Sequence, residues 1–184
     1  MEPHEDPDRA TRSTDRSDHA ELFTTAFRTL SPSVRGYLRA RGVEDCEAVT
    51  QDVFLALYSR MDNLRGGLEG AKALVFTIAH SRTVDHYRRR ERTPAMVPHE
   101  PESDLRTAPA TPEDLALAGS GALGLLNGLT EDHREVLLLR VVADLSIEQT
   151  AEIMGRTTGA IKQLQRRALE ALRTHALTTE LSTS

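Results

Sequence analysis

The chain has 184 residues and a formal net charge of −5, with 39% hydrophobic but only 4% aromatic side chains. So few aromatic and β-branched runs leave little material for a large twisted sheet, which favours an all-α fold. The acidic balance excludes a uniformly basic protein that coats nucleic acid. No stretch approaches the roughly 18 apolar residues of a membrane span, and the polar N-terminus does not resemble a secretory signal, so we expect a cytoplasmic protein.

The charges are unevenly distributed along the chain. Residues 19–92 carry a net charge of +3, whereas residues 1–18, 93–111 and 112–184 carry −3, −2 and −3. Within the last block, the stretch from position 156 to 175 holds five basic residues and one acidic residue. The net charge therefore conceals two local basic sites, one in each half of the chain.

Apolar residues at helical spacing predict four helices in the first half. These helices cover residues 21–30, 34–41, 46–61 and 72–90. Residues 1–18 lack apolar periodicity, so we expect a disordered tail there. Pro32 separates the first two helices because proline disrupts a helix interior, and the glycines between Leu64 and Gly70 predict a loop. The single cysteine, Cys46, excludes an internal disulfide and the usual Cys/His zinc site.

A linker is predicted for residues 93–111, which contain four prolines and no sustained apolar stripe. Thr111 and Pro112 provide an N-cap and a proline at the first helical position, so a new helix starts there. A further helix is expected over residues 130–142. Residues 179–184 are expected to form a second disordered tail.

The strongest functional pattern lies near the C-terminal end. Ser146 and Gln149 have the SxxQ spacing of a capping box, which predicts the start of a short helix that ends at Gly155. A longer helix follows, capped by Thr157 or Thr158. A short capped helix, a tight turn with glycine and a longer basic helix form the outline of a helix-turn-helix.

The longer helix carries its polar donors on one face. Lys162 lies four residues before Arg166, and Gln163 four residues before Arg167, so two adjacent rows project opposite an apolar stripe. A major groove about 12 Å wide accepts one α-helix, and Lys, Arg and Gln reach base edges and phosphates there. The pattern favours binding of duplex DNA over a merely solvated basic face.

Two further patches lie in the first half. An arginine-rich run at residues 88–92 follows the glycine loop, a combination suited to phosphates and unstacked bases, although the helix dipole alone also favours cations at a helix end. Glu47, Gln51 and Asp52 form an acidic, amide-bearing face that either docks a basic protein partner or is simply solvated.

Catalysis is the least supported class of function. His80 and His86 are six residues apart and fall on different helix faces, and Asp85 completes neither a triad nor a metal site. The phosphate-loop, dinucleotide, zinc-protease and serine-hydrolase motifs are missing from the sequence. We therefore predict no catalytic residues, no metal, no cofactor and no small-molecule substrate.

In its order of elements, the chain resembles an RNA polymerase sigma factor of the sigma-70 family, in the small extracytoplasmic-function (ECF) group. The resemblance covers about residues 19–174 and rests on GVEDCEAVTQDVFLALYSRMDNLRGG, ALVFTIAHSRTVDHYRRRER and LTEDHREVLLLRVVADLSIEQTAEIMGRTTGAIKQLQRRALEALR. It implies two small helical domains joined by a flexible linker, with region 2 at residues 19–92 and region 4 at residues 112–178.

The resemblance also implies a role for each candidate residue. Core polymerase would be contacted by Asp45, Glu47, Gln51, Asp52 and Phe54. The unpaired −10 strand would be bound by Arg65, Gly66, Gly67, Lys72, Ser81, Asp85, His86, Arg88, Arg89 and Arg90. The duplex −35 element would be bound by the helix-turn-helix from Ser146 to Gln165 and the turn of helix after it, through Arg156, Thr157, Thr158, Gly159, Lys162, Gln163, Arg166 and Arg167.

A sigma factor of this kind would bind core RNA polymerase and direct promoter-specific initiation. The implied partners are the clamp of the largest polymerase subunit, the flap of the second subunit, and promoter DNA in duplex and single-stranded form. An anti-sigma factor, often a membrane protein in this family, is expected to hold the protein inactive. The alternative is a free-standing helix-turn-helix regulator that binds duplex DNA without polymerase.

Overall fold

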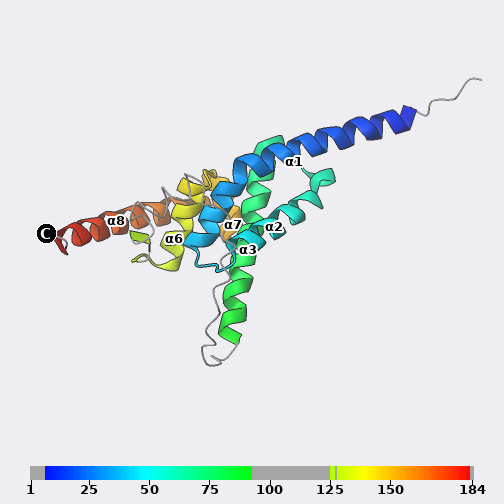
Figure 1. Ribbon diagram of the computed structural model, residues 1–184. Helices are drawn as coiled ribbons and strands as arrows, with labels where there is room; N and C mark the ends of the chain where they lie inside the picture. Colours follow the sequence, from blue (N-terminus) through cyan, green and yellow to red (C-terminus); the bar gives the residue numbers. More distant parts are fainter. Residues whose placement is uncertain (1–6, 93–124, 127, 183–184) are drawn as a thin grey trace, which may run out of the picture.

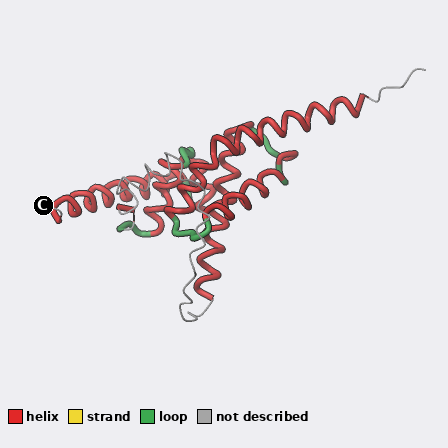
Figure 2. Tube along the Cα trace, in the orientation of Figure 1, coloured by secondary structure: helices red, strands yellow, loops and turns green. Residues whose placement is uncertain are grey.

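The computed structural model describes residues 7–92, 125–126 and 128–182, and every regular element in these ranges is helical (Figures 1 and 2). The elements are α1 (Pro7–Ala40), α2 (Cys46–Tyr58), the 3₁₀ helix η1 (Met61–Asn63), α3 (Gly67–Arg92), α6 (Glu131–Leu137), the π-helix η2 (Leu138–Val142), α7 (Ile147–Met154) and α8 (Thr158–Ser182). The predicted all-α fold is confirmed. The expected linker, and most of the helix expected after it, lie outside the described residues.

Helix α1 is longer than the sequence predicted. It begins at Pro7, within the expected disordered tail, and passes through Pro32, where a break was expected. Pro7 occupies the first helical position, where its missing N–H is not needed, and extending a packed helix by one residue adds a hydrogen bond at little cost. Pro32 is tolerated because the buried stripe continues in register from Leu30 to Val34. Both expectations were wrong for the described residues.

The glycine loop is shorter than expected, because α3 begins at Gly67 and leaves only residues 64–66 between α3 and η1. Gly66 and Gly67 have φ angles of 83° and 56°, a left-handed conformation that glycine adopts without strain. Gly70 lies inside α3, and a Cβ atom there would stand 1.8 Å from the carbonyl oxygen of Arg65. These glycines therefore allow a tight reversal into α3, not an open loop.

Helices α1, α2 and α3 pack around an apolar core in the first half. Tyr37 and Leu38 of α1, Phe54 of α2, and Val75 and Phe76 of α3 are at most 2% exposed. The rings of Tyr37 and Phe76 meet edge-on, with their centroids 5.8 Å apart. This packing fixes the orientation of α3, and with it the polar residues that α3 exposes.

The second half is built from α6, η2, α7 and α8. Ile161 and Ala168 of α8 are 0% exposed and pack in one cluster with Val136 of α6 and Ala151 of α7. The helix expected over residues 130–142 is α6 continued by the π-helix η2.

The second half begins with a capped helix, α6, and ends with the long helix α8. Thr130 caps α6, because its side-chain oxygen accepts a hydrogen bond from the His133 amide at 3.4 Å. Helix α8 continues to Ser182, so the tail expected from residue 179 is helical up to that point. Among the described helices, none combines the length and apolar character that a bilayer span requires.

The two halves are in direct contact. Leu138 and Leu139 of η2, with Ala143 and Leu145 after it, belong to the same buried cluster as the core of α1 to α3. Helix α1 contacts η2, and α3 contacts α7. The N-terminal end of α1, the C-terminal end of α3 and the C-terminal end of α8 project in different directions from this packed centre (Figure 1).

Candidate polymerase and nucleic-acid interfaces

The predicted helix-turn-helix is present with the expected caps. The Ser146 hydroxyl accepts from the Gln149 amide at 3.1 Å, and the Gln149 side-chain oxygen accepts from the Ser146 amide at 2.8 Å, so the capping box is confirmed. Gly155 ends α7 in the left-handed conformation, with φ of 61°. Thr157 caps α8 by accepting from the Ala160 amide at 3.2 Å. Thr158 is the first residue of α8.

The polar face of α8 is open to solvent. The predicted −35 residues on the turn and on this helix are all exposed, namely Arg156, Thr157, Thr158, Gly159, Lys162, Gln163, Arg166 and Arg167. On the opposite side, Ile161 and Ala168 are fully buried. Arg166 Nη1 lies 3.2 Å from Glu170 Oε1, a weak surface pair that leaves the Arg166 side chain 66% exposed. The face can therefore meet a macromolecule without rearranging the core beneath it.

Arg156 already has an acidic partner inside the second half. Its Nη2 atom lies 2.6 Å from Oδ2 of Asp132 at the start of α6. Both side chains remain about half exposed, so the pair is a weak one and the guanidinium stays accessible to solvent. The pair links the turn of the helix-turn-helix to α6.

The predicted −10 residues are less uniform. Arg65, Gly66, Gly67, Ser81, Asp85 and Arg88 are exposed. Lys72 is only 13% exposed, and its amine donates to the carbonyl oxygen of Asp144 at 3.0 Å and pairs with Glu69 at 3.0 Å. The His86 ring is half-buried, and its Nε2 atom is buried without a hydrogen-bond partner among the described residues. The side chains of Arg89 and Arg90 lie outside the described ones. The structure therefore does not present Lys72 and His86 to DNA as the sequence suggested.

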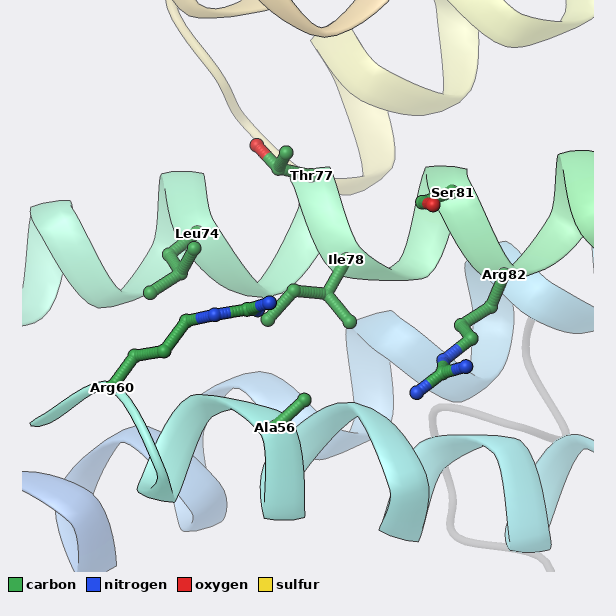
Figure 3. Close-up of a pocket in the computed structure, with 7 residues that line it drawn as sticks. All are labelled: Ala56, Arg60, Leu74, Thr77, Ile78, Ser81 and Arg82. Atoms are coloured by element: carbon green, nitrogen blue, oxygen red, sulfur yellow. The ribbon is translucent and has the colours of Figure 1, made fainter.

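A cavity of about 390 Å³ lies between α2 and α3, beside Ser81 (Figure 3). Its lining residues are Ala56, Arg60, Leu74, Thr77, Ile78, Ser81 and Arg82. The Arg60 side chain extends alongside Leu74 to Ile78, and the Arg82 side chain lies at the opposite end, beyond Ile78. An apolar floor between two guanidinium groups suits a planar base with its phosphate.

Arg60 and Arg82 were absent from the sequence-based predictions. They lie 22 positions apart, Arg60 in the turn between α2 and η1 and Arg82 in α3, so no local spacing relates them. Only the packing of α2 against α3 brings them to one cavity.

The predicted polymerase residues on and beside α2 differ in their exposure. Asp45, Glu47, Gln51 and Asp52 are all exposed, and Asp45 is also the N-cap of α2, where it accepts from the Ala48 amide at 3.0 Å. Phe54 is a correction, because its side chain is only 2% exposed and its ring centroid lies 4.9 Å from that of Phe27. A core residue of this kind stabilises the helix and cannot reach a partner.

The apolar side chains that α2 does expose are Leu55 and Tyr58, at 67% and 60%. Tyr58 also meets Phe23 of α1 edge-on at 5.2 Å between centroids, and Phe27 is 42% exposed. Gln51, Leu55 and Tyr58 follow the i, i+4, i+7 spacing of one helix face, so the sequence held a signal for them.

Within the residues that the structure describes, three or more His, Cys, Asp or Glu side chains nowhere converge in a group able to hold a metal ion. The fold and its exposed surfaces instead define a two-part helical transcription factor with a C-terminal helix-turn-helix. Comparison with known proteins supports this class: the sequence profile of the family "Sigma-70, region 4" matches residues 125–174.

Two named relatives identify the group within the sigma-70 family. The "ECF RNA polymerase sigma factor SigD" of Mycobacterium tuberculosis (strain H37Rv) is 35% identical over 154 residues, which cover 79% of this chain and 72% of SigD. The "ECF RNA polymerase sigma factor ShbA" of Streptomyces griseus is 33% identical over 137 residues, which cover 69% of each protein. The chain belongs to the ECF group of RNA polymerase sigma factors.

Two solved structures share the fold. One is the sigma factor RpoE in complex with the anti-sigma factor NepR from Bartonella quintana, with a TM-score of 0.61, 23% identity, and coverage of 84% of this chain and 96% of that chain. The other is CnrH in complex with the cytosolic domain of CnrY, with a TM-score of 0.59, 22% identity, and coverage of 87% and 95%.

Family membership establishes the function at the level of the whole protein. The chain binds core RNA polymerase and directs promoter-specific initiation through −10 and −35 elements, and it is not an enzyme. The alternative of a free-standing regulator that acts without polymerase is not supported.

Proposed function

We propose that the exposed face of α8 reads the −35 element as duplex DNA. The observation that carries this assignment is the opposition of two faces on one helix: Lys162, Gln163 and Arg166 are exposed, and Ile161 and Ala168 are fully buried. An α-helix so oriented can enter a major groove while its other side stays packed on α6 and α7. The four-residue spacing then places two rows of donors along the bases and phosphates.

The unpaired −10 strand is assigned to α3 and to the cavity between α2 and α3. Arg65, Ser81 and Arg88 are exposed along α3 and the turn before it, and Arg60 and Arg82 reach into the cavity. Single-stranded DNA binds where cationic groups follow the backbone and a flat pocket accepts a base. We therefore add Arg60 and Arg82 to the residues proposed from the sequence.

The polymerase contact is assigned to the face formed by Glu47, Gln51, Asp52, Leu55 and Tyr58. Exposed acids and an amide beside two exposed apolar side chains suit a basic, amphipathic partner helix. By family analogy this partner is the clamp of the largest subunit, and the second half would meet the flap of the second subunit. We assign region 2 to residues 19–92 and region 4 to residues 112–178.

We further propose that an anti-sigma factor controls this chain. The support is that Bartonella quintana RpoE, which shares the fold, forms a complex with the anti-sigma factor NepR. A protein that works with polymerase is expected in the cytoplasm, and a membrane-bound inhibitor would hold it at the membrane.

Run-off transcription with core polymerase and genomic fragments tests these assignments. The intact protein should give defined start sites, and its Lys162→Ala/Arg166→Ala variant should bind polymerase but lose protection of the −35 element. Arg173→Ala is the matched control, because Arg173 is an exposed arginine further along the same helix. The proposal fails if no fragment supports a promoter-dependent transcript, or if the Lys162→Ala/Arg166→Ala variant leaves the −35 footprint unchanged.

A further inference from the structure

The cavity between α2 and α3 has the size and the lining of a site for a small free molecule. Its volume of about 390 Å³ falls within the range of small-molecule sites, about 300–1,000 Å³. The floor is apolar, because Ile78 is buried and Leu74 and Ala56 are half-buried. All of its lining residues come from positions 56–82, so the first half of the chain forms the cavity by itself.

The two arginines of the cavity are available to a ligand. Arg60 and Arg82 are both exposed, and neither guanidinium forms an ion pair or a hydrogen bond with another residue that the structure describes. By comparison, Arg156 and Arg166 of the second half each pair with a carboxylate. A guanidinium that stays unpaired beside an apolar floor suits a ligand that is both planar and anionic.

The two guanidinium groups lie at different places along the cavity, which gives it a direction. The Arg60 side chain extends alongside Leu74 to Ile78, whereas the Arg82 side chain lies beyond Ile78 (Figure 3). A guanidinium plane that runs along an apolar floor can stack on the face of a nucleobase. Arg82 is then left for an anionic group at the far end, where its fork of donors matches the oxygens of a phosphate.

The remaining lining favours a polar, bicyclic ring. Ser81 is exposed at the cavity, and its hydroxyl makes no hydrogen bond to another described residue, so it can donate to or accept from a base edge. Leu74 and Ile78 are four positions apart on one helix face, where neighbours stand about 5–6 Å from each other. A purine covers a floor of this length more fully than the single ring of a pyrimidine.

We propose that this cavity binds a free purine nucleoside monophosphate, with its base against Arg60 and the apolar floor and its phosphate on Arg82. A free monophosphate carries about 1.5 to 2 negative charges at pH 7, more than the single charge of each phosphate in a DNA strand, so Arg82 favours the free nucleotide.

The bound nucleotide competes with the unpaired −10 strand for the cavity. This consequence rests on the proposed function, whereas binding of the nucleotide does not. Competition lowers the apparent affinity for the strand in proportion to the occupancy of the cavity, so initiation would respond to the concentration of the nucleotide.

The test is a nuclear magnetic resonance titration of the full chain at one fixed salt concentration. Adenosine 5′-monophosphate (AMP) is the probe, and adenosine and inorganic phosphate are its two truncated forms. AMP should shift amide signals of α2 and α3 around the cavity. It should bind at least about tenfold more tightly than either truncated form, because each of them loses the contacts at one end of the site.

Substitutions separate the two ends of the site. Arg82→Ala should weaken binding of AMP by about tenfold and leave adenosine unchanged, because it removes only the phosphate contact. Arg60→Ala should weaken both ligands, and so should Arg60→Lys, which keeps the charge but lacks the planar group. The matched control Arg28→Ala removes an exposed arginine of α1 outside the lining and should change neither affinity.

The outcomes distinguish this inference from the proposed function. Absence of shifts around the cavity at millimolar AMP, or binding that Arg60→Ala and Arg82→Ala leave unchanged, overturns the nucleotide site. A labelled single-stranded −10 oligonucleotide, taken from a mapped start site, gives the second measurement by fluorescence anisotropy. Displacement of the oligonucleotide by AMP supports both the site and the competition.

The two remaining outcomes are equally decisive. AMP bound in the cavity without displacing the oligonucleotide would keep the nucleotide site but overturn the competition and the assignment of the −10 strand to this cavity. Oligonucleotide binding that requires Arg60 and Arg82, in protein that does not bind AMP, would overturn the nucleotide site and leave the proposed function standing.

Discussion

The two regions that we propose to face DNA present their cationic side chains in different ways. On α8 every predicted −35 residue is exposed, and one short sequence stretch supplies the whole face. On α3 the predicted −10 residues divide into exposed ones, such as Ser81 and Arg88, and partly buried ones, such as Lys72 and His86. The difference shows that a surface carried by one helix can be predicted locally, whereas a surface shared by several elements depends on what packs beside it.

The largest expected effect contrasts a buried side chain with an exposed one on α2. Phe54→Ala should lower the free energy of unfolding by about 3–5 kcal/mol, because it removes a packed aromatic ring from the core. Leu55→Ala, one position along and 67% exposed, should change it by less than about 0.5 kcal/mol. Urea unfolding followed by circular dichroism measures both.

Leu55→Ala, which should hardly change stability, should have a clear effect on polymerase binding. We expect folded Leu55→Ala protein to bind core polymerase more weakly, because Leu55 lies on the proposed contact face. Equal binding by Leu55→Ala and the parent would remove this residue from the interface.

The next effect concerns the recognition helix. Lys162→Ala or Arg166→Ala should each weaken binding to a −35 duplex by about 1–3 kcal/mol if the side chain contacts a base in bidentate fashion. Arg173→Ala should change binding much less, because it lies beyond the recognition turn. Fluorescence anisotropy with labelled duplex at one fixed salt concentration gives the comparison. Equal losses for all three variants would indicate a non-specific cationic helix.

A smaller effect tests whether the helix-turn-helix is stabilised locally. Ser146→Ala removes the side-chain oxygen that accepts from the Gln149 amide, and it should cost about 1 kcal/mol of stability. Ser59→Ala is the control, because the Ser59 hydroxyl only donates to a carbonyl one turn back near the end of α2. Thermal unfolding distinguishes them, and similar melting temperatures would show that tertiary packing alone holds α7.

The last prediction concerns the contribution of Glu135 to stability, which should change only on acidification. Burial acts to raise the pKa of Glu135, but the hydrogen bond with His80, the charge of Arg41 and the hydrogen bond from Tyr37 outweigh it, so the pKa is lowered. A carboxyl group with a lowered pKa stabilises the folded state above its ordinary pKa of about 4.3, and this stabilisation is lost as pH falls through the lowered value.

The stability difference between the parent and Glu135→Gln should therefore shrink as the pH falls below about 4.3. Burial and the Glu135 carboxylate raise the pKa of Tyr37 well above its ordinary value, so its hydroxyl stays protonated in this range. Urea unfolding at several pH values measures the difference. A stability difference that does not shrink below about pH 4.3 would assign the effect to another group.

Much of this molecule was predictable because its strongest signals are local. The capping box of Ser146 and Gln149, the left-handed Gly155 and the opposed faces of α8 all depend on residues within a few positions of one another. Helical periodicity also predicted α2, whose buried residues include Phe54. The wrong prediction was that Phe54 also contacts core polymerase.

The wrong boundaries have a common cause. Pro32 and the glycines before α3 are local signals for a break or a loop, but packing against other helices overrode them. Proline costs a hydrogen bond, and a stripe that stays buried on both sides of it, as from Leu30 to Val34, offsets that loss.

By itself, then, the sequence determined the all-α fold, the helix-turn-helix and the family, since all three follow from short-range spacing and segment order. The tertiary structure alone decided that Arg60 and Arg82 share a cavity and that Lys72 meets Asp144. It also decided that Glu135 is buried among side chains from 55 to 98 positions away. Buried charges find their partners by proximity in space, and no periodicity along the chain encodes that proximity.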